Sequence, residues 1–362
     1  MKSGSISISQ FIAILMLSTG LMNHVIIIPT LLDAAKRDAW LSVLLTGVIM
    51  ILWAALLYVI IRRINKQHLV HYLMERIPPI VVYALVGVIC IYLFLIFSIT
   101  VNDTINWIKL SFSPRIPIFV LSLLLTTICC INALLGVQSI SNIATILLPF
   151  VILLGIFAAL ATVPHKDYSL IKPILEYGMQ PVWNGVLYAG AGFSELVMLL
   201  FIQHKIKSKI SYPMLLLLIF ILVGLTIGPL MGSIVEFGPD HAAKLRYPAY
   251  EEWRLITIGH YVEHLDFLSI YQWFSGAFIR ISLSLFIILE ILCLKHAKQR
   301  IIALSIILIM NIVLNLLPIS NILFLFFMKQ VLPIFFYGVI LFTIVLSLII
   351  ALPKRERGLA DD

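Results

Sequence analysis

Three charged residues lie inside long apolar segments, where a charge is rare and could do chemistry. Glu195 follows a glycine-rich string, and Arg280 and Glu290 share one later segment. Charged side chains in hydrocarbon are costly and usually face a polar interior or a partner. Arg280 could therefore pair with Glu195 or hold a ligand carboxylate through two hydrogen bonds, and Glu195 could carry a proton in a dry site. Glu290 lies nearer a segment end, and we expect it to be an interfacial group.

Glycines and polar residues interrupt two of the apolar segments near their centres. The first interruption covers residues 18–24 and is followed by Pro29, and the second covers Gly185 and residues 190–195. Backbone groups freed by such breaks need a cavity or a ligand to satisfy them, which predicts a small-molecule site. Alternatively, the small residues only let helices pack closely. Two breaks in matching positions favour the site.

The segments that must position these residues are long enough to span a bilayer. A span needs about 20 apolar residues in a helix, and ten segments qualify. We place them near residues 8–30, 39–61, 80–103, 116–136, 141–163, 184–203, 212–236, 268–294, 301–318 and 331–351.

The composition of the chain supports the same class. Of 362 residues, 62% are hydrophobic and 12% are charged, and the mean hydropathy is +1.10. A soluble domain carries about 25% charged residues. The chain is therefore predicted to be an all-α polytopic membrane protein with one transmembrane domain over residues 1–362. Soluble enzymes, nucleic-acid-binding proteins and disordered scaffolds are excluded, so we expect the formal charge of +8 to face membrane lipid rather than nucleic acid.

Lysine and arginine in the connecting segments indicate the orientation. With the N-terminus placed inside, 14 of these 25 residues fall in inner segments and 10 in outer ones. Few acidic residues accompany the inner group, so most of the net positive charge lies on that side. The positive-inside rule then predicts that both termini are cytoplasmic.

The two interrupted segments are the first and the sixth of the ten. They would therefore open two five-helix repeats, at about residues 8–163 and 184–351. Broken helices in corresponding positions of two halves are typical of inverted-repeat transporters, whose binding site lies at the repeat interface.

Two segments outside the spans are longer than turns. Residues 67–77 place apolar side chains on one stripe, which predicts a short helix on the inner surface. Residues 237–267 form an outer loop of a length usual for a lid, a gate or a docking surface. Asp103 and Glu236 lie at outer helix ends, where we expect them to be solvated. Tyr92, midway along the third span, could line the site or be satisfied by a neighbouring helix.

Metal and cofactor chemistry receive little support from the sequence. All four cysteines lie in apolar runs and are predicted to be free thiols rather than disulfides or metal ligands. The outer loop contains His260-Tyr-Val-Glu263-His264, which is the spacing of one class of zinc protease, but no convincing acidic ligand follows. We expect no metal, no cofactor and no enzymatic activity.

Several strings of the chain resemble the B subunit of bacterial spore germination receptors, which belongs to the amino acid–polyamine–organocation transporter superfamily. They are Pro29 with residues 38–42, Pro173 with residues 176–178, residues 192–195, and Pro248 with residues 263–266 and Trp273. Their order and spacing extend over about residues 8–350. The family usually has Glu-Arg where this chain has Glu263-His264, which accounts for the protease-like spacing.

The resemblance implies a LeuT-like fold and a nutrient germinant, often an amino acid, bound among helices 1, 3, 6 and 8. The corresponding positions in this chain are Gly20, Met22, Tyr92, Gly192, Phe193, Arg280 and Ser284. Met22 and His24 depart from the glycine-richer first helix of the family, so the identity of the germinant stays open. The resemblance also implies a larger membrane A subunit and a lipoprotein C subunit as partners, in the inner membrane of the spore.

Three functions stay open at this level. The first is a nutrient-sensing subunit that binds a small molecule from the outer side and shifts a conformational equilibrium. The second is a proton-coupled amino acid transporter that uses Glu195. The third is a membrane metalloprotease that uses His260, Glu263 and His264.

Overall fold

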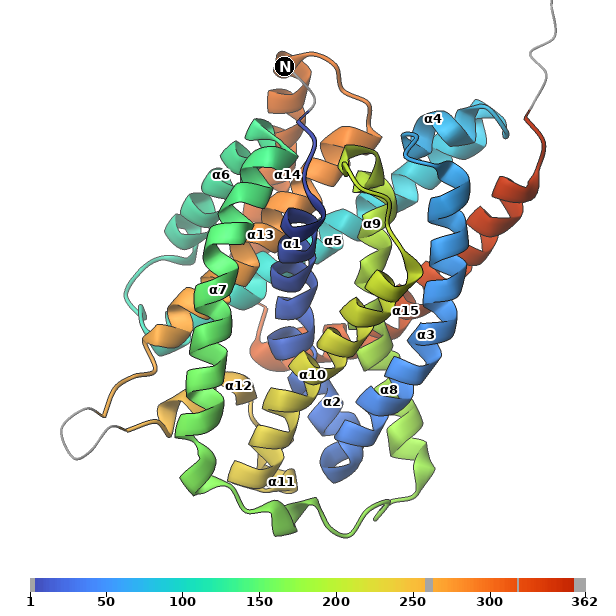
Figure 1. Cartoon of the computed structure of the whole chain (residues 1–362). Helices are drawn as coiled ribbons and strands as arrows, with labels where there is room; N and C mark the ends of the chain where they lie inside the picture. Colours follow the sequence, from blue (N-terminus) through green and yellow to red (C-terminus); the bar gives the residue numbers. More distant parts are fainter. Residues whose placement is uncertain (1–3, 258–262, 318, 355–362) are drawn as a thin grey trace, which may run out of the picture.

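The computed structural model describes residues 4–257, 263–317 and 319–354 and consists almost entirely of helices (Figure 1). Ten of the described helical segments are long and apolar enough to cross a membrane. An isolated parallel β-bridge joins Ile6 to Ile206. The prediction of an all-α, multi-pass membrane protein is confirmed. The inverted relation between the two five-helix repeats stays a prediction.

The first half of the chain contains five spans and one short helix. The elements are α1 (Ile8–Leu21), η1 (Met22–Ile26), α2 (Ile28–Ala35), η2 (Lys36–Asp38), α3 (Ala39–Ile64), α4 (Leu69–Met74), α5 (Pro79–Ser111), α6 (Ile118–Leu135), α7 (Val137–Ala161), η3 (Val163–His165) and η4 (Tyr168–Ile171).

The second half contains the other five spans. The elements are α8 (Met179–Ser194), η5 (Glu195–Met198), α9 (Leu199–Ile202), η6 (Gln203–Lys205), α10 (Tyr212–Phe237), α11 (Pro239–Ala242), α12 (Pro248–Arg254), α13 (Leu268–Ile291), α14 (Ala297–Leu316) and α15 (Asn321–Ala351).

The bundle has two ends, which we name after the short helices that lie there. The start of the chain and α4 lie at one end, the α4 end, and α11 and α12 lie at the opposite end, the α12 end (Figure 1). Lys354, just after α15, pairs with Glu75 beside α4 at 3.0 Å. Both ends of the described chain therefore lie at the α4 end, as the orientation prediction requires.

The helices that carry the predicted site residues form the centre of the bundle. Within an apolar stretch of 18 residues, 83% of the residues are buried in α13 and 89% in the span Met179–Lys205. In α7 the corresponding share is 6%. Helix α13 contacts α1, α5, α6 and α7. The outer helices leave many large apolar side chains exposed, which suits a lipid-facing surface.

Two spans extend beyond their predicted limits at the α12 end. Helix α5 continues to Ser111 instead of ending near residue 103, and α15 begins at Asn321 instead of near 331. Asp103 was taken as a solvated helix end, and this was wrong: it is 1% exposed and forms an ion pair with Arg246. Because its charge has a partner, α5 can continue through it, with Thr104 and Trp107 also buried.

The segment at residues 67–77 forms the predicted short helix, α4, with Leu69, Val70 and Leu73 buried. Its position on a membrane surface stays a prediction. The four cysteines are free thiols, as predicted.

The described part of the outer loop, residues 237–257 and 263–267, contains the short helices α11 and α12, which contact α10. Glu236 was expected to be solvated, and this was wrong as well: its side chain is 0% exposed and lies 3.7 Å from Lys166 Nζ. Glu252 from α12 is its neighbour and accepts a hydrogen bond of 2.8 Å from the Ser233 hydroxyl. A side chain at Gly232 would lie 2.7 Å from Glu252, so glycine makes room for this carboxyl group.

This carboxyl pair predicts a pH dependence of stability. Burial raises the pKa of Glu252 well above its ordinary value, and the Glu236 carboxylate raises it further, whereas the Ser233 hydrogen bond and Lys166 oppose the shift. Because the folded state binds this proton more tightly than the unfolded state, Glu252 contributes stability at low pH that is lost as the pH rises. A single such group lowers the free energy of unfolding by about 1.4 kcal/mol per pH unit between its two pKa values.

We therefore expect Glu252→Gln to raise the melting temperature of the detergent-purified protein at neutral pH and to flatten its decline with pH. Glu251→Gln is the matched control, since Glu251 pairs with Arg254 at the surface. An unchanged pH profile in Glu252→Gln, or an equal change in the control, would contradict this assignment.

Candidate functional site

The first span is broken at Met22–Ile26, which form a π-helical segment between α1 and α2. The Ile27 N–H donates to the Met22 carbonyl at 3.0 Å, five residues back. Pro29 lacks an N–H to continue the regular pattern, and such π segments are frequent at functional sites. The break lies later than residues 18–24, because the α-helix continues through Gly20 to Leu21.

The sixth span is altered just after its glycines. Helix α8 remains regular to Ser194, and the chain then tightens into the 3₁₀ segment η5, which begins at Glu195. The predicted unwinding at residues 190–195 is therefore wrong in position. In an apolar environment the intrahelical hydrogen bonds are the available partners for the backbone, so glycine alone does not open a helix.

The glycines of α8 act through close approach instead. A Cβ on Gly192 would lie 2.5 Å from Asn23 Oδ1, and one on Gly190 would lie 2.7 Å from Phe336. Gly192 thus lets the end of α8 approach η1 closely. Gly20 is less restrictive, since a Cβ there would meet Leu225 at 3.5 Å, an ordinary contact distance.

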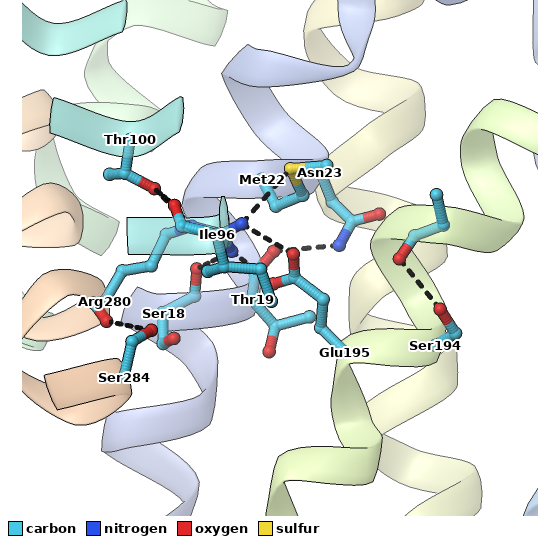
Figure 2. Close-up of polar contacts among 11 residues, drawn as sticks. Ser18, Thr19, Met22, Asn23, Ile96, Thr100, Ser194, Glu195, Arg280 and Ser284 are labelled. Atoms are coloured by element: carbon cyan, nitrogen blue, oxygen red, sulfur yellow. Dashed lines mark hydrogen bonds and ion pairs between the residues drawn. The ribbon is translucent and has the colours of Figure 1, made fainter. Parts of the chain in front are cut away.

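An ion pair between Arg280 and Glu195 occupies the space between these two breaks (Figure 2). Both side chains are 1% exposed. Arg280 Nη1 and Nη2 each donate to one carboxylate oxygen of Glu195, the second at 2.5 Å. This two-pronged arrangement is the strongest form of such a pair. Of the two sequence-based alternatives for Arg280, pairing with Glu195 is the one present in this structure.

Three further contacts hold the Arg280 guanidinium. Its Nε donates to the Thr100 hydroxyl at 2.8 Å, its Nη1 donates to the Ser18 carbonyl at 3.3 Å, and its Nη2 lies 3.4 Å from Met22 Sδ. Figure 2 shows these groups arriving from α5, α1 and η1 around the side chain from α13. Arg280 of α13 therefore contacts the first, third and sixth spans. All four helices that were predicted to form the site meet at this side chain.

Several polar atoms around this pair lack a hydrogen-bond partner among the described residues. They are the hydroxyl oxygens of Ser18 and Thr19 and the Oδ1 atom of Asn23. Asn23 Nδ2 donates to the Thr19 carbonyl at 2.8 Å, which orients the amide. Buried polar atoms are rarely left unpaired without a reason, and here they form a group of acceptors beside a carboxylate.

The other predicted site residues lie at different distances from this centre. Phe193 is fully buried, and the Ser284 hydroxyl donates to the Arg280 carbonyl at 2.9 Å, so Ser284 supports the helix rather than the guanidinium. Tyr92 packs its ring edge against Phe335, with ring centroids 5.0 Å apart. Its hydroxyl is buried without a partner in the described chain and lies within electrostatic range of Glu195 and Arg280.

The predicted site residues did not include several contacts of this centre, namely Ser18, Thr19, Asn23 and Thr100. Thr100 follows Tyr92 by eight residues and Ile96 by four, which places all three on one face of α5. That spacing was a usable signal for Thr100. Asn23 lay within the predicted break, and only the close approach of Gly192 shows that its side chain matters.

A group of aromatic rings covers the α12 end of the bundle. Trp107 of α5 stacks on Trp273 of α13 with centroids 4.1 Å apart, and Tyr250 of α12 and Tyr247 lie edge-on to these two rings. The buried Asp103–Arg246 pair ties the segment before α12 to α5. These contacts hold the described part of the outer loop against the end of the bundle. Its action as a lid, a gate or a docking surface stays a prediction.

Two other features lie away from this centre. An apolar cavity of about 460 Å³ is lined by residues of α5, α6, α7 and α13, among them Ile105, Leu125 and Phe274, and none of the predicted site residues lines it. At the α4 end, the described residues include two groups with metal-ligating atoms, and both include His68. Burial, with the neighbouring His204 and His71, lowers the pKa of His68 to about 4.

Glu290 belongs to this α4 end. It pairs with Lys205 at 2.9 Å, with His204 at 3.5 Å and with Arg300 at 3.5 Å. The expected interfacial role agrees with its place near the end of α13. His260, on which the protease-like spacing depends, lies outside the described residues.

Comparison with known proteins decides the family of the chain. The family model described as spore germination protein matches residues 5–321, which include both breaks and the Arg280–Glu195 pair. The chain belongs to the spore germination protein family. It is 44% identical over 349 residues to spore germination protein XB of Bacillus anthracis, covering 96% of this chain and 98% of that protein.

Two further proteins are similar to this chain at lower identity. The putative spore germination protein YfkT of Bacillus subtilis (strain 168) is 27% identical over 296 residues, with 80% of this chain and 78% of that protein covered. Spore germination protein A2 of the same organism is 26% identical over 204 residues, with 55% and 54% covered. The resemblance noted from the local strings is confirmed at the level of the family.

Proposed function

We propose that this protein is the nutrient-sensing membrane subunit of a spore germination receptor and binds a small germinant, of amino acid type, between its two broken helices. The observation that carries the proposal is the buried Arg280–Glu195 pair, in which Arg280 joins Glu195 at the start of η5 and also contacts Met22 of η1. Binding is the whole task under this proposal, and the protein performs no enzymatic reaction. The LeuT-like inverted repeat supplies the two conformations.

An amino acid fits the charges and the unpaired atoms of this centre. Its carboxylate can take the place of Glu195 on Arg280, because both present two oxygens to the guanidinium. Its ammonium group can then donate to Glu195 and to the unpaired oxygens of Ser18, Thr19 and Asn23. In this exchange the Arg280–Glu195 ion pair is replaced by one ion pair between Arg280 and the ligand carboxylate and another between Glu195 and the ligand ammonium group. The direct contact between α13 and η5 is thereby lost. A ligand that favours one arrangement in this way shifts the conformational equilibrium.

The surroundings of the receptor follow from the same family. A membrane A subunit and a lipoprotein C subunit would be the partners, and the inner membrane of the spore would be the location, with both termini cytoplasmic. The charge distribution supports this orientation, in which the aromatic rings of the α12 end would face the side from which a germinant arrives.

A second candidate function is proton-coupled amino acid transport. The observation that favours it is the buried carboxyl of Glu195, which a proton could neutralise when Arg280 turns to a ligand. Uptake of amino acid into proteoliposomes that is abolished in Glu195→Gln would support transport, and binding without uptake would support sensing alone.

The first test is a germination screen with a variant of Tyr92. Spores that lack this protein and spores with Tyr92→Ala are compared on amino acids, sugars and nucleosides. We expect both to lose the response to one nutrient class, because Tyr92 combines an unpaired hydroxyl with a position near the ion pair. Tyr83→Ala is the matched control, since Tyr83 lies on the same helix with 65% of its surface exposed. An unchanged response of the deletion strain to every nutrient would contradict the proposal.

A further inference from the structure

Three side chains with metal-binding atoms come together at the α4 end of the bundle, far from the central ion pair. His68, His71 and Cys293 each offer one such atom, and these atoms lie within 4.8 Å of one another. Two imidazoles and one thiol are a donor set that zinc-type ions prefer. From the sequence alone we expect no metal site here, because all four cysteines lie in apolar runs.

The backbone positions these donors from two elements. His68 precedes the first residue of α4 and His71 lies three residues later, so the two rings share one face with centroids 5.1 Å apart. Cys293 follows the end of α13 and is held in the left-handed region at φ 52°, where glycine is favoured. The thiol is free, with a single weak contact of 3.7 Å from Sγ to the Ile291 carbonyl.

One ring nitrogen of His68 lacks a hydrogen-bond partner in the described part of the chain, although the ring packs against His71 and His204. Its Nδ1 atom is buried and has no hydrogen-bond partner among the described residues. An unsatisfied buried polar atom costs about 1–3 kcal/mol, and coordination of a metal would satisfy it. His71 is exposed, so the group has an open side through which an ion can enter.

A second group, made of His68, His204 and Glu290, lies beside the first. Its carboxylate is already engaged by Lys205 and Arg300, at 2.9 and 3.5 Å. Those two cations make Glu290 a poor first ligand. The ring of His204 lies edge-on to His68, with centroids 4.8 Å apart, and its Nε2 is 3.5 Å from Glu290. His204 is therefore available as a further ligand, and Glu290 lies close enough to support its ring, as carboxylates do for metal-bound histidines.

We propose that His68, His71 and Cys293 bind a divalent transition-metal ion of the zinc type. The fourth position of a tetrahedral ion would be open to water or to His204. Metal–nitrogen distances are about 2.0–2.1 Å and metal–sulfur distances about 2.3 Å, so the three donors must draw closer than their present separation. The exposed His71 side chain is free to make most of that movement.

The bound ion would connect two parts of the fold that are distant in sequence. Helix α4 lies between the second and third spans of the first half, whereas Cys293 ends α13, the helix that carries Arg280. A metal that binds the assembled group stabilises this arrangement of the α4 end over any arrangement in which α4 and α13 separate. This inference does not rest on the proposed germinant, because the site has its own donors.

The test uses the full-length protein purified in detergent, treated with a chelator and titrated with Co²⁺ as a spectroscopic substitute for Zn²⁺. We expect saturable binding of one equivalent with a thiolate-to-cobalt charge-transfer band, and a melting temperature that rises when Zn²⁺ is added. Cys293→Ser should remove the band, and His71→Ala should weaken binding by at least about tenfold. Because His71 is exposed, its replacement tests the site without disturbing the fold.

Matched controls come from residues of the same types elsewhere in the chain. Cys90→Ser replaces another partly exposed thiol and His165→Ala another exposed histidine, and both should keep the band and the affinity. Absence of saturable binding, or a band that persists in Cys293→Ser, would overturn the proposal. Loss of binding in His204→Ala with no change in His71→Ala would overturn the ligand set proposed here.

Discussion

Replacing Arg280 with methionine is expected to lower the free energy of unfolding by about 3–5 kcal/mol, the usual cost of breaking a buried ion pair from one side. The variant leaves the Glu195 carboxylate 1% exposed and without its counter-charge. It also removes the donors to the Thr100 hydroxyl and the Ser18 carbonyl. Denaturant or thermal unfolding of the purified protein, compared with the unaltered chain, measures the effect.

Two further variants show whether the loss comes from an uncompensated charge. Lys329→Met breaks the pair with Asp33, whose side chains are 39% and 46% exposed. We expect that exposed pair to contribute at most about 1 kcal/mol. The double variant Arg280→Met with Glu195→Leu removes both charges and should recover most of the stability, since apolar replacements of buried pairs are often neutral. If the double variant is no more stable than Arg280→Met alone, this account is contradicted.

The same double variant separates folding from sensing. If it accumulates at normal levels and unfolds at a normal temperature but no longer responds to the germinant, the ion pair is needed for the response and not for the fold. A natural protein keeps a buried pair that an apolar pair could replace when the charges have another task. Exchange of Glu195 for a ligand carboxylate on Arg280 is such a task.

The ten spans were predictable because a bilayer requires long apolar segments in which the backbone satisfies itself. The errors in the predicted limits of these spans have a common physical cause at the α12 end. Asp103 looked like the end of a helix, since a charge in sequence resembles contact with water. The Arg246 side chain that neutralises it lies 143 residues away, and sequence spacing does not show such a partner.

The charged residues of the candidate site could be predicted from the sequence, but their arrangement in space could not. The charges Glu195 and Arg280 and the interrupted first and sixth spans were visible as departures from apolar periodicity. Both breaks lie later in the chain than the sequence predicts. Glycine permits a helix to unwind without requiring it, and Pro29 disturbs the helix at the residues that precede it. Which face of α13 carries Arg280 depends on helix packing, so its pairing with Glu195 stayed open until the fold was known.

The histidine and cysteine group at the α4 end was beyond sequence reasoning. Its donors come from a short helix and from the end of α13, and neither segment carries a recognised metal-binding spacing. The prediction for Cys293 set a free thiol against both a disulfide and a metal ligand. The structure confirms that the thiol forms no disulfide, whereas its approach to two histidines is a tertiary contact that local sequence does not show.

A methyl group added at Gly192 should impair the germinant response strongly while leaving the protein folded. The added Cβ would lie 2.5 Å from Asn23 Oδ1 and 3.0 Å from Asn23 Cγ, so the Asn23 amide must turn away. Overpacking of this kind costs about 1–3 kcal/mol. A cost that falls on one of two conformations changes their ratio by about 5- to 150-fold. Germination rates of Gly192→Ala and Gly192→Val spores over a range of nutrient concentrations would show this, with the valine variant more affected.

The decisive control for Gly192 lies in its contact partner. The atoms nearest to the added Cβ all belong to the Asn23 side chain, so Gly192→Ala combined with Asn23→Ala restores the space. If crowding of the contact between α8 and η1 is the cause, this double variant should respond better than Gly192→Ala alone. Gly87→Val is the control for replacing a helical glycine by valine where no contact is crowded, because a Cβ on Gly87 has no neighbour within 4 Å. A normal response in Gly192→Val would mean that the two broken helices do not move against each other when the germinant acts, and the sensing site would have to lie elsewhere.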